Sequence, residues 1–112
     1  MTLTVTEKNQ DNKLVIYCEG RIDSTNAHLF EEKLAAVIGE EKSKFIIDFT
    51  KIAFVSSAGL RVLLIAAKKV KPKGGVVFLT GLSPEVQEVF DISGFTSLFT
   101  IYKTVDEALA NY

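Results

Sequence analysis

The stretch FIIDFTKIAFVSSAGLRVLLIAAKKV, residues 45–70, passes from a buried strand to an amphipathic helix. Residues 44–49 are mostly apolar, which is typical of a strand that is covered on both faces. After two adjacent serines, apolar residues recur at helical spacing from Leu60 to Val70, with charged side chains between them. The pattern therefore predicts a strand, a loop and a helix that begins near Ser57, with this serine as its cap.

Hydrophobic periodicity predicts the remaining elements on either side of this stretch. Apolar and hydroxyl residues that alternate with period two indicate a half-buried strand at 2–7, and apolar runs bounded by turn residues indicate strands at 14–20, 76–80 and 98–102. Apolar residues at helical spacing indicate helices within 21–42, 82–94 and 104–112, capped by Ser24, Ser83 and Thr104. Strands that alternate with helices predict an α/β fold, with a mixed but mostly parallel sheet of about five strands and about four helices. The first two strands are expected to form a hairpin.

The composition sets limits on the class of protein. The chain has 112 residues, which fits a single domain over residues 1–112. Its hydrophobic content of 47% is typical of a globular domain, and its net charge of -1 argues against nucleic-acid binding. Cys18 is the only cysteine, so an internal disulfide is excluded and a cytoplasmic location is expected. No apolar run reaches the ~20 residues that span a membrane, so no membrane insertion is expected.

Candidate catalytic groups are sparse. His28 is the only histidine and lies within a predicted helix, where such a residue is more often exposed or packed than catalytic. The serines lack both the G-x-S-x-G turn of hydrolases and a neighbouring base. The chain also lacks the glycine patterns of P-loop and dinucleotide-binding proteins. We therefore expect no enzymatic activity, no cofactor and no metal site.

The adjacent serines, Ser56 and Ser57, could cap a helix, act as a nucleophile, bind an anion or accept a phosphate. Capping alone is a sufficient explanation, because serine oxygens commonly accept backbone N–H groups at helix starts. The small residues Ala58 and Gly59 allow another molecule to approach the helix start closely. Free N–H groups and the helix dipole favour negative charge there, so a phosphate on Ser57 is compatible with the fold.

Three segments in order carry a resemblance to a known family. They are VIYCEGRIDSTNAHLFEEKL (15–34), FIIDFTKIAFVSSAGLRVLL (45–64) and VFDISGFTSLFTIYKTVDEAL (89–109). Together they resemble the STAS domain, and within it the single-domain anti-sigma factor antagonists. The resemblance covers nearly the whole chain, and the three segments in order are far more specific than any one of them.

The resemblance implies a phosphorylation site. In that family, an anti-sigma factor with serine kinase activity phosphorylates a serine, which corresponds here to Ser57. The preceding residue is usually aspartate in the family, but here it is Ser56, which is therefore a second candidate acceptor. The implied partner-binding residues are Asp23, Ser24, Ser56, Ser57, Ala58, Gly59, Leu60 and Arg61.

The resemblance also implies partners and leaves alternatives open. The expected partners are the anti-sigma factor kinase and a phosphatase that resets the switch, with the protein itself a monomer or a weak dimer. One alternative is an accessory STAS subunit of a lipid-transport ATPase complex, which would not need phosphorylation. Another is a nucleotide-binding STAS module, although no phosphate-binding loop supports it.

Overall fold

Five strands form one sheet in the part of the chain that the computed structural model describes, residues 3–10, 13–37 and 44–112. Their order in the sheet follows the sequence: β1 (Thr4–Gln10), β2 (Lys13–Ile22), β3 (Lys44–Val55), β4 (Val76–Thr80) and β5 (Thr100–Tyr102). The pair β1 and β2 is antiparallel, and the other three pairs are parallel. The predicted mixed, mostly parallel sheet is therefore confirmed.

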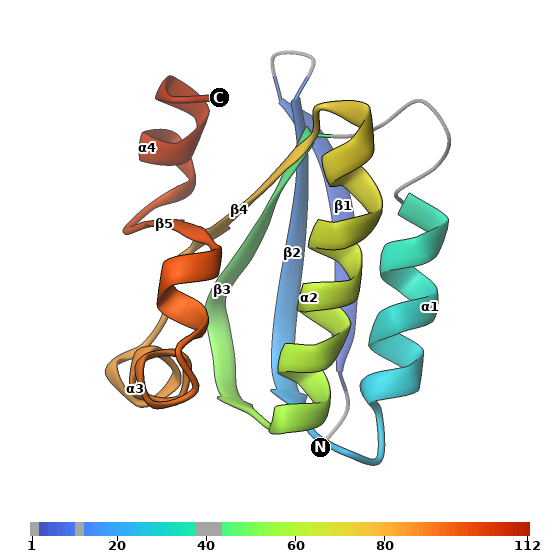
Figure 1. The fold of residues 1–112 in the computed structure, drawn as a ribbon, viewed down its shortest axis with the longest axis vertical. Coiled ribbons are helices and arrows are strands. Elements are labelled where there is room, and N and C mark those ends of the chain that lie inside the picture. The colour runs from blue at the N-terminus through green and yellow to red at the C-terminus, as the bar shows by residue number, and fades with distance from the viewer. Residues whose placement is uncertain (1–2, 11–12, 38–43) are drawn as a thin grey trace.

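Within the described ranges, four α-helices connect or follow these strands, as predicted: α1 (Ala27–Val37), α2 (Ser57–Val70), α3 (Pro84–Ile92) and α4 (Val105–Ala110). The helices α1, α2 and α3 pack on one face of the sheet, and the short α4 lies on the other (Figure 1). The predicted cap residues Ser83 and Thr104 are confirmed, since their side chains accept the N–H groups of Val86 and Glu107.

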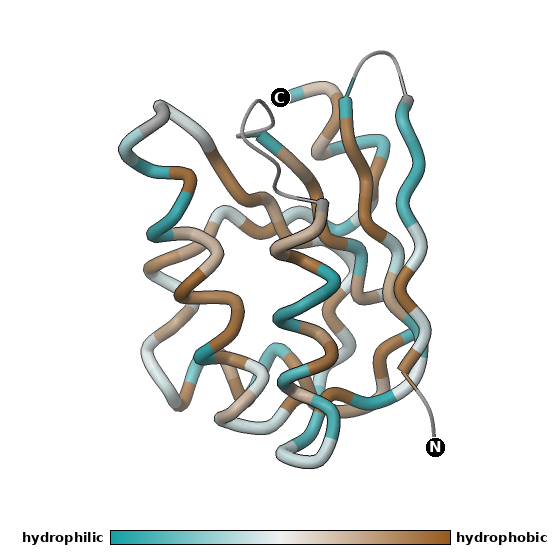
Figure 2. The backbone as a smooth tube through the Cα atoms, turned by 90° about the vertical axis from the view of Figure 1, so that its right-hand side faces the viewer, coloured by the Kyte–Doolittle hydropathy of each residue, from teal (hydrophilic) through white to brown (hydrophobic). Residues whose placement is uncertain are grey.

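Two apolar clusters hold these layers together. The larger lies between the sheet and α1, α2 and α3, and its fully buried members include Phe30, Phe45, Leu63 and Phe90. The smaller lies under α4 and contains Val15, Ile46, Phe78 and Ala108. Figure 2 shows hydrophobic positions concentrated along the strands, with hydrophilic positions recurring along the helices. The helix α4 covers only part of the sheet face on which it packs. Much of β1 and β2 therefore has no helix over it on that face.

Three predicted boundaries are wrong. The strand predicted at 44–49 continues to Val55, because β2 runs beside it through two register shifts and leaves no room for a loop. The helix predicted within 21–42 begins only at Ala27, so Ser24 is not its cap. The strand predicted at 98–102 begins at Thr100, because a short 3-10 helix, η2 (Phe95–Leu98), occupies the preceding residues.

The C-terminal end of α2 stops as predicted. The chain tightens into a 3-10 turn, η1 (Lys71–Lys73), and then reaches Gly74 with φ of 73°. Glycine adopts this left-handed conformation without steric cost. Residues 11–12, in the predicted turn between the first two strands, lie outside the described residues. So do residues 38–43, which include the end of the helix predicted within 21–42. Among the described helices, none has the length and apolar character required to cross a bilayer.

Candidate functional site

The carboxyl ends of β2 and β3 lie side by side at one edge of the sheet. Ile22 pairs with Val55 in the parallel ladder, and the Ser56 N–H donates to the Ile22 carbonyl over 2.8 Å. Beyond this pair, the chain turns at Asp23 after β2 and enters α2 after β3. The structure thus brings the two separated parts of the predicted site together.

Ser56, rather than Ser57, caps α2. Ser56 has extended backbone angles, and its Oγ accepts the Gly59 N–H over 3.4 Å. The cap predicted at Ser57 is therefore wrong by one residue, because β3 extends as far as Val55. Ser57 is instead the first residue of the helix, and its side chain is exposed. The two serines thus differ in role: Ser56 caps the N-terminus of α2, whereas Ser57 is exposed to solvent.

Loss of the capping oxygen should cost little stability. We expect Ser56→Ala to lower the free energy of unfolding by about 1 kcal/mol, the usual effect of removing a serine cap. The matched control is Ser57→Ala, which should change it by less than about 0.5 kcal/mol, as an exposed substitution does. Urea denaturation of the three proteins measures both values. A larger loss in Ser57→Ala than in Ser56→Ala would contradict the assignment of the cap.

Gly59 and Leu60 pack the start of α2 against the sheet. A Cβ added to Gly59 would lie 2.6 Å from Ile22 Cγ2 and 3.0 Å from Val55 Cγ1, so only glycine allows this close approach. Leu60 is 2% exposed and belongs to the larger core cluster. We expected both residues at the partner-binding surface, but their burial gives them a packing role. Arg61, the next residue, is exposed.

A hydrogen-bonded turn follows β2. Asp23 Oδ1 accepts both the N–H and the hydroxyl of Thr25. The Asn26 side chain accepts the Asp23 N–H over 2.9 Å and donates to the Arg21 carbonyl over 2.9 Å. This network explains why α1 begins after Asn26 and why Ser24, which is exposed in the turn, does not cap it. It fixes the Asp23 carboxylate within the turn that follows β2.

The pKa of Asp23 reports on this turn. The hydroxyl and N–H of Thr25 are the main causes that hold the pKa of the Asp23 carboxyl below its ordinary value. We expect Thr25→Val to raise that pKa, as measured by NMR titration of the carboxyl carbon. A lowered pKa stabilises the fold at neutral pH, and this contribution is lost as the pH falls through the folded-state pKa. An unchanged titration curve in Thr25→Val would contradict the network.

Arg21 and Phe54 also belong to this edge, although the sequence pattern did not single them out. They are paired in the β2–β3 ladder, and the Arg21 guanidinium carbon lies 4.6 Å from the Phe54 ring centroid. Phe54 remains 37% exposed, three residues before Ser57. Exposed aromatic and arginine side chains dominate the binding energy of many interfaces. Only the pairing register between β2 and β3 brings Arg21 and Phe54 together, and the sequence alone does not provide that register.

Comparison with known proteins identifies the family. A family model described as the STAS domain matches residues 4–108. The chain belongs to the STAS domain family. BtrV of Bordetella bronchiseptica, a candidate anti-sigma factor antagonist, is 36% identical over 102 residues, covering 91% of this chain and 88% of BtrV. The anti-sigma-B factor antagonist of Bacillus subtilis is 30% identical over 101 residues, covering 90% and 92%.

Solved structures show the same fold. An anti-sigma factor antagonist from Mycobacterium paratuberculosis superposes with a TM-score of 0.89 at 24% identity, covering 98% of this chain and 93% of that one. The phosphorylated form of the Bacillus cell fate determinant SpoIIAA gives a TM-score of 0.72 at 21% identity, covering 96% and 98%. The names of BtrV and of the Bacillus subtilis relative both describe anti-sigma factor antagonists, which are regulators.

Proposed function

We propose that this protein is an anti-sigma factor antagonist whose binding is switched by phosphorylation of Ser57. The observation that carries the proposal is the exposed Ser57 hydroxyl at the first position of α2, beside the Asp23 turn. The relatives named as antagonists over nearly the full chain supply the class of partner. The site of action is the cytoplasm, where sigma factors act on transcription.

The proposed cycle has two states. The unmodified protein binds the anti-sigma factor and thereby releases a sigma factor. The anti-sigma factor then acts as a kinase: the Ser57 oxygen attacks the γ-phosphorus of ATP, the bond to the ADP oxygen breaks, and the hydroxyl proton leaves. The phosphoserine carries about -1.5 to -2 charges, which a helix N-terminus tolerates but a close protein interface does not. A phosphatase hydrolyses the phosphate ester and restores the binding form.

Phe54 is expected to be an anchor of this interface. We predict that Phe54→Ala weakens binding to the anti-sigma factor at least tenfold, since a partly exposed aromatic ring at an interface is the typical residue whose loss is costly. The fold should survive, because the ring lies at the edge of the sheet and outside both core clusters. Isothermal titration calorimetry measures the change in affinity, and circular dichroism checks the fold.

Val76 offers a matched control for this prediction. It is also 37% exposed, but it pairs with Lys44 at the opposite end of β3 from Phe54. Val76→Ala should leave the affinity within about twofold, as expected of a surface change away from the interface. Equal losses from the two substitutions would place the interface elsewhere.

The experiment that tests the function is a paired pull-down from the lysate of the native host, read by mass spectrometry. The baits are the unmodified protein and Ser57→Asp. Capture of a serine kinase-like protein by the first bait, with its loss from the second, supports the switch. Capture of the same transport ATPase subunit by both baits would favour the accessory-subunit alternative and leave Ser57 without a regulatory role.

A further inference from the structure

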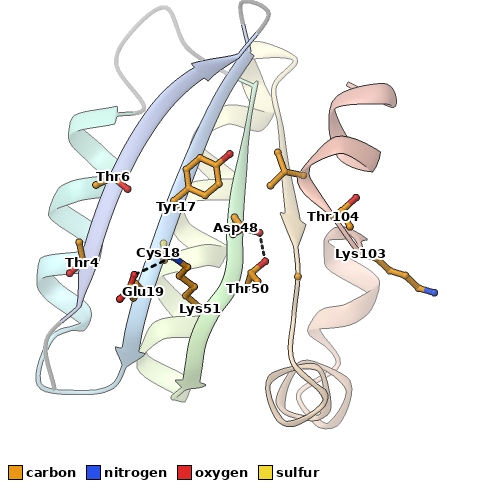
Figure 3. Close-up of a pocket in the computed structure, with 12 residues that line it drawn as sticks. Thr4, Thr6, Tyr17, Cys18, Glu19, Asp48, Thr50, Lys51, Lys103 and Thr104 are labelled. Atoms are coloured by element: carbon orange, nitrogen blue, oxygen red, sulfur yellow. Dashed lines mark hydrogen bonds and ion pairs between the residues drawn. The ribbon is translucent and has the colours of Figure 1, made fainter.

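A cleft lies on the face of the sheet opposite α1 and α2 (Figure 3). It has a volume of about 570 Å³ and is bordered by β1, β2, β3 and the start of α4. Small-molecule sites have volumes of roughly 300 to 1,000 Å³, so the cleft is of a suitable size for one. Side chains that line it include those of Thr4, Thr6, Tyr17, Glu19, Asp48 and Thr50. The cleft is separate from the edge that carries Ser57, so binding in it does not depend on the proposed function.

Asp48 is the buried polar group of this cleft. Its side chain is 7% exposed, and its Oδ1 accepts the hydroxyls of Thr50 and Thr80, each over 2.8 Å. Both donors are neutral, and no hydrogen bond to Oδ2 is found among the described residues. Among the described residues, no fully buried side-chain polar atom lacks a partner, so Oδ2 is not completely sealed from solvent. Because Asp48 lines the cleft, a molecule in the cleft can reach this oxygen.

The cations around the cleft do not compensate Asp48. Within the described residues, no lysine or arginine nitrogen lies within 4 Å of its carboxylate. Lys51 is paired with Glu19 across 3.8 Å at the rim. Lys103 lies at the far end and extends away from the cleft (Figure 3). A buried carboxylate without a counter-ion is costly, so it favours a ligand that brings a positive charge.

We propose that this cleft binds a small organic ammonium compound. Its N–H groups donate to Asp48 Oδ2, and its carbon chain lies along Tyr17 and the side chains at the start of α4. A charge-assisted hydrogen bond of this kind is stronger than one between neutral groups. The same carboxylate disfavours phosphate-bearing molecules, including nucleotides, in this cleft.

The test compares three probes of similar size, n-butylammonium, n-butanol and butyrate, in NMR titrations of the full chain at constant ionic strength. Saturable shifts of the Asp48, Thr50 and Thr80 amides with n-butylammonium alone are expected. Equal shifts with n-butanol, shifts with butyrate, or no saturable shift with n-butylammonium would overturn the proposal.

Three variants complete the test. Asp48→Asn should weaken n-butylammonium binding at least tenfold, whereas the control Asp91→Asn, at an exposed carboxylate outside the cleft, should retain it. If Asp48→Asn fails to fold, Thr6→Trp provides the second measurement. Thr6 is exposed on β1 and lines the cleft, so an indole there should fill the space and weaken binding at least tenfold. Unchanged affinity in the folded variant would overturn the proposal.

Discussion

Ser57→Ala is expected to abolish phosphate incorporation by the cognate anti-sigma factor kinase. Ser57 is exposed at the first position of α2, and its hydroxyl takes no part in the helix cap. A kinase can therefore reach the oxygen without opening the fold. Incubation with the kinase and ATP, followed by intact mass measurement, should show one added phosphate on the unmodified chain and none on the variant.

Ser56→Ala is the control for this result. Ser56 Oγ accepts the Gly59 N–H, and the residue is less exposed than Ser57. The variant should lose some stability but still incorporate one phosphate. Incorporation that survives in Ser57→Ala and disappears in Ser56→Ala would move the acceptor to Ser56.

Phosphorylation is expected to weaken binding to the anti-sigma factor at least a hundredfold. The phosphate adds about -1.5 to -2 charges. A unit charge placed about 4 Å from a partner carboxylate costs on the order of 4 kcal/mol at an effective dielectric of about 20. A loss of about 2.7 kcal/mol is already a hundredfold, since each 1.4 kcal/mol is tenfold. The bulk of the phosphate adds steric conflict to this effect.

Calorimetry with the unmodified and phosphorylated proteins measures this loss. The loss should shrink as the salt concentration rises, because salt screens exposed charges. Ser56→Asp is a useful control, since aspartate also caps helices and is the usual residue of the family at this position. It should retain binding within about tenfold. Equal affinities of the unmodified and phosphorylated proteins would contradict the proposed switch.

Periodicity predicted the architecture because the core of this fold is built from local patterns. The mostly apolar run at 44–49 forms the first half of β3, and the apolar residues at helical spacing from Leu60 to Val70 form the buried face of α2. The boundaries failed where a hydrogen bond outside the pattern decided them. Asn26 shifts the start of α1, and pairing with β2 prolongs β3 to Val55.

The site was predictable only in part. The motif around Ser57 is continuous in sequence, and a resemblance to a family was enough to select it. The cation–π pair of Arg21 and Phe54 depends on the register between β2 and β3, which includes two shifts. The cleft at Asp48 depends on how much of its own face of the sheet α4 leaves uncovered. Both features arise from contacts between distant segments, so no local pattern reveals them.

The most direct test of the switch is a competition assay that follows release of a labelled sigma factor from its anti-sigma factor. The competitor is this protein, added either unmodified or stoichiometrically phosphorylated on Ser57. We predict that the unmodified protein releases the sigma factor and that the phosphorylated protein does so only at concentrations at least a hundredfold higher. Release at the same concentration by both forms, or by neither, would contradict the proposed switch.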